Sequence, residues 1–196
     1  MKKIALFSSL IASAIVLSMS ACDTKKQHVP DNDESIEIAE KANDSTFTDR
    51  TEEKDADFIV NAVSSNIAEI KIAQLAKNKA ISADVKKMAA TLEEQHMKIL
   101  KELRAYADSK GIAIPLDESD KDVKQMNDLT EESGEKFDKQ WCKAMEDRHE
   151  NSIKKFESRR DKTEDPALRE WIVATLPGLK EHLAMIEEHE KAHDGM

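Results

Sequence analysis

Histidines are the side chains of this sequence best suited to chemistry, because imidazole binds metals and changes its charge near neutral pH. The sequence from residue 54 onward contains five of them, and helical periodicity places all five on or beside the apolar face of a predicted helix. Buried imidazole nitrogens need hydrogen-bond partners or a metal. The five are therefore candidates for an internal site: His96, His149, His182, His189 and His193.

One carboxylate, Glu69, also falls on an apolar face, where an ionised group needs a partner. A helix rises about 1.5 Å per residue, so Glu69 and His96, on either side of one predicted turn, should lie at similar heights in the bundle. His149 and His182 lie on either side of another predicted turn, and their heights should agree within about one helical turn. We predict that these four side chains converge at mid-bundle. Two interpretations stay open: a hydrogen-bonded polar layer that sets helix register, or a metal site of one carboxylate and three imidazoles.

Two Glu-x-x-His motifs add secondary candidates. Glu93 precedes His96 and Glu146 precedes His149 by three residues, the spacing by which di-iron and di-manganese bundles supply ligands from two helices. Both glutamates fall at the edge of the apolar stripe rather than at its centre. They are therefore secondary metal ligands, behind Glu69 and the three histidines.

Other reactive groups predict no catalysis. Cys142, beside Trp141, is interpreted as a small apolar residue, and the pair His189 and His193 as incidental to a helix end that frays. The sequence contains no glycine-rich phosphate loop and no nucleophile elbow. We therefore predict no catalytic residues, and a divalent metal is the one candidate cofactor.

Composition indicates the elements that must position these residues. The chain has 196 residues, with 30 Lys and Arg against 40 Asp and Glu, and only 4 glycines and 4 prolines. So few turn-forming residues, with aromatics at 4%, argue against sheet folds, while 36% charged residues favour long helices. The net charge of −10 makes nucleic acid an unsuitable partner.

Periodicity and capping residues then predict an all-α fold, a four-helix bundle over residues 54–193. Ser82 is a predicted N-cap, Gly111 a C-terminal glycine, and Asp165-Pro166 a helix start. Pro177 lies inside the last helix and is expected to kink it. The long helices are expected over about 54–80, 83–110, 134–161 and 166–192, with a short helix over about 119–131.

The N-terminal residues predict export and a lipid anchor. Lys2 and Lys3 precede an apolar run, and small residues come directly before Cys22, as in a bacterial lipoprotein signal over residues 1–21. Lipid on Cys22 would hold the protein to a membrane of the cell envelope. Residues 22–53 are polar and aperiodic, so we expect a flexible tether.

Several segments resemble the exported bacterial family called domain of unknown function 4142, which is considered ferritin-like. The resemblance rests on segments around Phe58 and Glu69, Val85 to His96, Leu103 to Gly111, Phe137 to His149, and above all Thr175-Leu176-Pro177-Gly178-Leu179-Lys180-Glu181-His182. It implies a ferritin-like bundle outside the cytoplasm and no established activity. The family's recurring polar positions correspond to Glu69, His96, His149 and His182. Its pattern has an aspartate before the first two histidines, where this chain has Gln95 and Arg148.

These observations predict a lipid-anchored envelope protein whose helical bundle is a binding or structural module with a buried Glu/His layer. The alternative is a ferritin-like protein that binds iron, manganese or zinc and has a redox or stress role. Neither interpretation identifies a protein partner.

Overall fold

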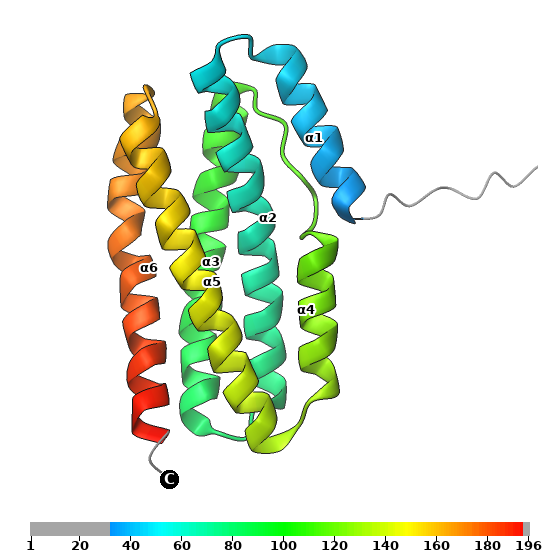
Figure 1. Cartoon of the computed structure of the whole chain (residues 1–196), viewed down its shortest axis with the longest axis vertical. Helices are drawn as coiled ribbons and strands as arrows, with labels where there is room; N and C mark the ends of the chain where they lie inside the picture. The colour runs from blue at the N-terminus through cyan, green and yellow to red at the C-terminus, as the bar shows by residue number, and fades with distance from the viewer. Residues whose placement is uncertain (1–31, 194–196) are drawn as a thin grey trace, which may run out of the picture.

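The computed structural model describes residues 32–193, and every regular element in that range is an α-helix, which confirms the all-α class. Four helices are long and two are short, and Figure 1 shows all six along the chain. Their bounds are α1 Asn32–Thr46, α2 Arg50–Lys79, α3 Ala83–Lys110, α4 Asp120–Glu131, α5 Gly134–Lys162 and α6 Pro166–His193.

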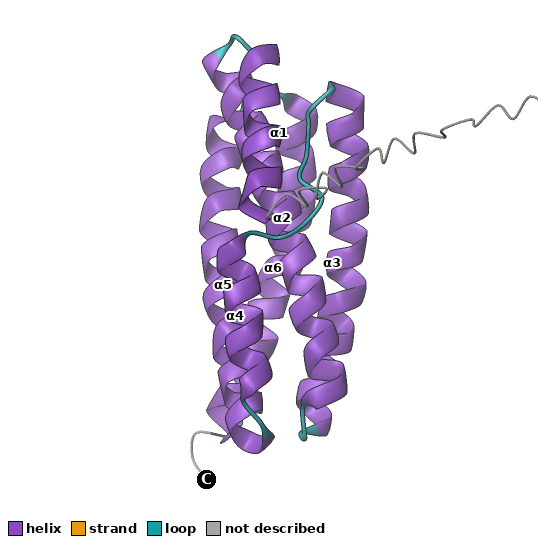
Figure 2. Cartoon of the chain, turned by 90° about the vertical axis from the view of Figure 1, so that its right-hand side faces the viewer, coloured by secondary structure: helices purple, strands orange, loops and turns teal. Residues whose placement is uncertain are grey.

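The four long helices, α2, α3, α5 and α6, run side by side along the length of the molecule (Figure 1). The most extensive packing pairs α2 with α3 and α5 with α6. The two short helices, α1 and α4, follow one another along one side of this group (Figures 1 and 2). Side chains from the long helices therefore meet in a shared interior.

Capping side chains set the helix ends, as the sequence predicts. The Ser82 hydroxyl accepts a hydrogen bond from the backbone of Val85, and Gly111 ends α3 at a φ of 68°. Asp165 caps α6 by accepting from the backbone N–H groups of Ala167 and Leu168. The start of α2 was predicted about four residues too late, because Asp49, which accepts from Thr51 and Glu52, is its actual N-cap.

The expectation of a flexible tether over residues 22–53 is wrong for residues 32–46, which form α1. Ala39 and Asn43 on this helix are buried, at 3% and 2% exposure. The Asn43 amide donates to the backbone carbonyl of Ala113 and accepts from its N–H, at 2.9 and 2.8 Å. The apolar stripe of α1 is short, so these contacts with distant residues, rather than its own periodicity, hold it in place.

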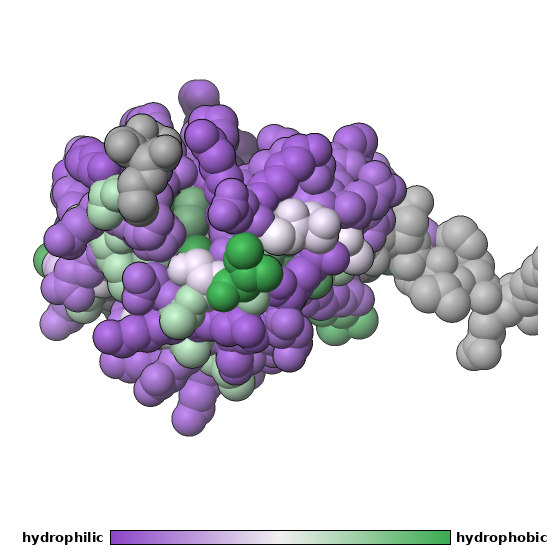
Figure 3. All heavy atoms as spheres, turned by 90° about the horizontal axis from the view of Figure 1, so that it is seen from below, coloured by the Kyte–Doolittle hydropathy of each residue, from purple (hydrophilic) through white to green (hydrophobic). Residues whose placement is uncertain are grey.

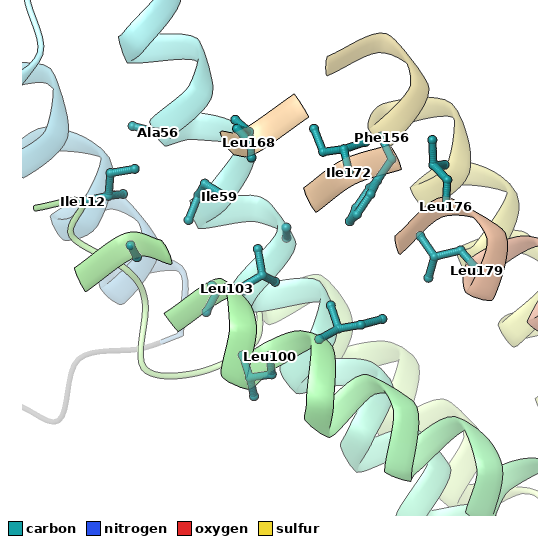
Figure 4. Close-up of a cluster of buried hydrophobic side chains, with 14 of the residues drawn as sticks. Ala56, Ile59, Leu100, Leu103, Ile112, Phe156, Leu168, Ile172, Leu176 and Leu179 are labelled. Carbon is teal, nitrogen blue, oxygen red and sulfur yellow. The ribbon is translucent and has the colours of Figure 1, made fainter. Parts of the chain in front are cut away.

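The core consists of two apolar clusters stacked along the long axis. One, shown in Figure 4, contains the first half of α2, the second half of α3, the end of α5 and the start of α6. The other contains the opposite halves, with the fully buried Phe137, Trp141 and Met145. Along each long helix the two clusters are separated by a short gap, at residues 68–71, 93–98, 146–152 and 180–185.

The predicted signal peptide over 1–21 and the lipidation site at Cys22 lie outside the described residues. Among the helices of residues 32–193, none combines the length and apolar composition that a membrane span requires. Pro177 lies within α6, and the helix continues through it to His193.

Candidate metal centre

The four residues selected from the sequence occupy the gap between the two apolar clusters, one from each long helix. Glu69 comes from α2, His96 from α3, His149 from α5 and His182 from α6. None of the four is more than 2% exposed. The structure therefore confirms that they converge at mid-height, as the register of the helices about their turns predicts.

One ring nitrogen of each histidine points at its neighbours. The Nε2 atoms of His96 and His149 are 3.3 Å apart, and His149 Nε2 is 3.1 Å from His182 Nδ1. The Oε2 atom of Glu69 lies 3.0 Å from His96 Nε2 and 3.7 Å from His149 Nε2. Among the described residues, these histidines are the only group of three potential ligands whose atoms all lie within 4.8 Å of one another.

The other ring nitrogen of each histidine contacts an oxygen atom. His149 Nδ1 donates to the carbonyl of Met145 at 2.8 Å, and His182 Nε2 donates to Gln95 Oε1 at 2.7 Å. His96 Nδ1 donates to Asn66 Oδ1 at 2.9 Å, and the Asn66 amide nitrogen donates to the carbonyl of Ala62, which orients the amide. Each outer nitrogen thus carries a proton, and in a neutral ring the inner nitrogen then has a free lone pair.

Charge in the cluster follows from its burial. Burial lowers the pKa of His96 to about 4 against the attraction of the Glu69 carboxylate, and it lowers the pKa of His182 to about 3, where His96 and His149 add to the shift. Burial raises the pKa of Glu69, but attraction to His96, His149 and Arg148 outweighs it and brings the value to about 2. At neutral pH the centre therefore presents a carboxylate together with neutral imidazoles at His96 and His182.

Arg148, which the sequence marked only as a departure from the family pattern, supports Glu69 from the side. Its Nε lies 3.7 Å from Glu69 Oε1, which also accepts from the Ser65 hydroxyl at 3.3 Å. The rest of the guanidinium donates to Asp122, Gln125 and the backbone of Ser65. Gln95, the other departure, holds His182, so both positions contact the centre.

The secondary candidates lie outside this group. Glu93 pairs with Lys77 and accepts from Gln74 on α2, which makes it a bridge between α2 and α3. Glu146 is half-buried and does not belong to the histidine group. Cys142 is buried, which raises its pKa to about 12, with Glu190 and Asp138 adding to the effect, so it stays a thiol at neutral pH.

The two C-terminal histidines also lie apart from the centre. His193 is exposed and His189 half-buried, near the end of α6. Their rings contact each other, with centroids 4.2 Å apart. Position on the apolar face thus predicted burial correctly for three of the five histidines. It failed for His189 and His193, which lie near the end of α6.

Comparison with known proteins gives one match. The family model described as Domain of unknown function (DUF4142) matches residues 40–188, more than half of the chain. No curated protein and no solved structure matches. The four residues of the centre all fall within the matched range.

Proposed function

The chain belongs to the family called domain of unknown function 4142, and from that premise we propose that it binds a divalent transition-metal ion at Glu69, His96, His149 and His182. The observation that supports this most strongly is the direction of the inner lone pairs. Three imidazole nitrogens lie within 4.8 Å of one another, and Glu69 Oε2 lies 3.0 and 3.7 Å from those of His96 and His149. These atoms are all acceptors, so a cation is the group that they can share.

The spacing of these atoms is close to that around a single ion. Ligands about 2.0–2.2 Å from a tetrahedral zinc lie about 3.3–3.6 Å from one another. The contact between His96 and His149 is 3.3 Å, those of His149 with His182 and of His96 with Glu69 are shorter at 3.1 and 3.0 Å, and that of His149 with Glu69 is longer at 3.7 Å. Oxygen partners on the outer nitrogens are the usual arrangement around metal-bound histidines, because they orient the ring and fix its tautomer. Three imidazoles and one carboxylate suit zinc, iron or manganese.

The alternative is a polar layer held by hydrogen bonds alone. In that layer the contact of His96 with Glu69 requires a proton on the inner nitrogen of His96 in addition to the outer one, so this ring would be charged. Burial opposes this, since it lowers the pKa of both His96 and His182 far below neutrality. A metal satisfies the same lone pairs without added protons.

The test is the metal content and metal-dependent stability of untagged protein. We expect about one equivalent of zinc, iron or manganese by elemental analysis, a melting temperature that falls with a chelator and recovers with the metal, and no such response in His96→Ala. His193→Ala, at an exposed histidine, is the matched control and should behave like the unmodified chain. Metal-free protein whose melting temperature ignores all three ions would overturn the proposal.

We also propose that the four long helices form a ferritin-like bundle and that lipid on Cys22 anchors it to a membrane of the bacterial cell envelope. One ligand from each long helix, converging at mid-height, supports the first part. The second part rests on the residues before Cys22. In such a bundle we propose a redox or stress role for the bound metal.

A further inference from the structure

A cavity of about 660 Å³ reaches the centre from one side. Its wall includes Ile36 from α1 and Asp122 from α4, two helices that follow one another along that side of the molecule (Figure 2), and it continues between α2 and α5. Glu69 and His96 line its inner part, whereas His149 and His182 are not among its lining residues. A ligand in the cavity would therefore approach the metal on its Glu69 and His96 side.

Polar atoms without partners gather on this cavity. Five buried side-chain polar atoms of residues 32–193 have no hydrogen-bond partner. Two of them, on Asp55 and Arg159, form an ion pair of 2.9 Å with each other. The other three, Ser64 Oγ, Glu69 Oε2 and Arg148 Nε, belong to residues that all line this cavity. Of these, Glu69 Oε2 lies 3.0 Å from His96 Nε2 and Arg148 Nε lies 3.7 Å from Glu69 Oε1, whereas Ser64 Oγ has no hydrogen-bond partner. Their side chains are nine-tenths or more buried, Arg148 being the most exposed at 10%.

Charge then indicates the class of ligand. With a divalent ion bound, cations outnumber anions around the cavity, the charged side chains being Glu69, Lys121, Asp122, Asp147, Arg148 and Lys155. The Nε–H of Arg148, which makes no hydrogen bond and lies 3.7 Å from Glu69 Oε1, and the hydroxyl of Ser64 are both donors. Desolvated donors beside a cation favour an anion that is small enough to enter a buried space.

We propose that this cavity binds a small carboxylate-type anion, which places one oxygen on the metal and receives hydrogen bonds from Arg148 and Ser64. The inference rests on the proposed metal centre and adds to it a ligand class and an entry side. Arg148 and Ser64 are binding residues in this arrangement. Because the anion would become an additional ligand of the metal, its binding can be followed in the visible spectrum of a suitable metal ion.

The test uses the full chain loaded with Co²⁺, whose visible spectrum changes when a ligand is added to the metal. Formate is the probe, and titration should shift the cobalt bands in a saturable way. Arg148→Gln should weaken formate binding about tenfold or more, because it removes a charge-assisted donor. Lys154→Gln is the control, since it removes an equal charge from an exposed residue of α5 that does not line the cavity.

Arg148→Gln also loses hydrogen bonds to Asp122 and Gln125 and could therefore misfold. Ser64→Ala provides a second test that does not depend on the folding of that variant. Ser64 Oγ has no hydrogen-bond partner in the structure, so its removal breaks no contact and should weaken formate binding about twofold to fivefold. A cobalt spectrum that formate does not change, or equal affinities in the unmodified chain and these variants, would overturn the anion site alone. Absence of any cobalt spectrum would overturn the metal centre and this site together.

Discussion

At the scale of residues, the outer contacts of the histidines decide what the centre can do. His96 and His149 keep their outer protons because Asn66 Oδ1 and the Met145 carbonyl only accept. The lone pairs are thereby directed inward, toward the Glu69 carboxylate. Arg148 supplies a positive charge next to that carboxylate and is not among the proposed metal ligands.

Acid should destabilise the metal-free protein in a defined range. Unfolded His96 and His182 would bind protons near their ordinary pKa of 6.5, whereas in the folded state their pKa values are lowered to about 4 and about 3. The unfolded chain therefore binds more protons below pH 6.5, and the free energy of unfolding should fall as pH decreases from about 6.5 to about 3. Glu69, whose pKa is also lowered, adds to the fall below about pH 4.5.

Urea unfolding at several pH values, in chelator, measures this dependence. His182→Gln removes one of the two shifted groups, so its stability should decrease less steeply between pH 6.5 and pH 4. A free energy of unfolding that stays constant from pH 7 to pH 4 would show that these rings are not buried as neutral groups.

At the scale of elements, α1 and α4 do different work from the long helices. They contribute none of the four proposed ligands, but both supply residues that line the cavity, Ile36 from α1 and Asp122 from α4 among them. Asp33 of α1 accepts a hydrogen bond from the backbone N–H of Asp120, the first residue of α4, and so joins the starts of the two helices. Packing of α1 therefore bears on access to the centre as well as on stability.

Asn43 is the residue whose loss should loosen α1. Asn43→Ala removes both hydrogen bonds to the Ala113 backbone and leaves those groups partly buried, which should lower the free energy of unfolding by about 1–3 kcal/mol. Amide hydrogen exchange should become faster in α1 than in α3. Asn78→Ala, at an exposed asparagine that bonds only its own helix, is the control and should change stability by less than about 0.5 kcal/mol. Equal effects of the two variants would contradict this role of Asn43.

At the scale of the whole molecule, the surface is charged and carries little apolar area. The end that includes the α2–α3 connection is mostly hydrophilic with a small hydrophobic patch (Figure 3). The large exposed apolar side chains of residues 32–193 are few and come from different elements: Ile38, Ile81, Met97, Leu116 and Val173. Removal of Lys2 and Lys3 with a signal peptide would change the net charge from −10 to −12. In the proposed arrangement the lipid on Cys22 would be the membrane anchor.

The anchor can be tested on the full-length chain. Cys22→Ser removes the proposed lipidation site, so the product should leave the membrane fraction or accumulate with its signal peptide uncleaved. Fractionation and the intact mass of the product measure both outcomes, and Cys142→Ser is the matched control, at a cysteine buried in the fold. A Cys22→Ser protein of mature mass that stays in the membrane would contradict lipid anchoring.

The sequence by itself determined the properties that arise within one helix. Apolar periodicity and caps such as Ser82, Gly111 and Asp165 depend on neighbours a few residues away, so they predicted the long helices and the inward side of Glu69, His96, His149 and His182.

Only the tertiary structure decided the rest, because it depends on how the helices are rotated and shifted against one another. The packing of α1, the oxygen partners of the histidines, the contact of Arg148 with Glu69 and the cavity beside them all join residues that are distant in sequence or brought together by packing. Periodicity gives the direction in which a side chain points but does not specify the atom that it meets, and that atom determines which ring nitrogen keeps its proton.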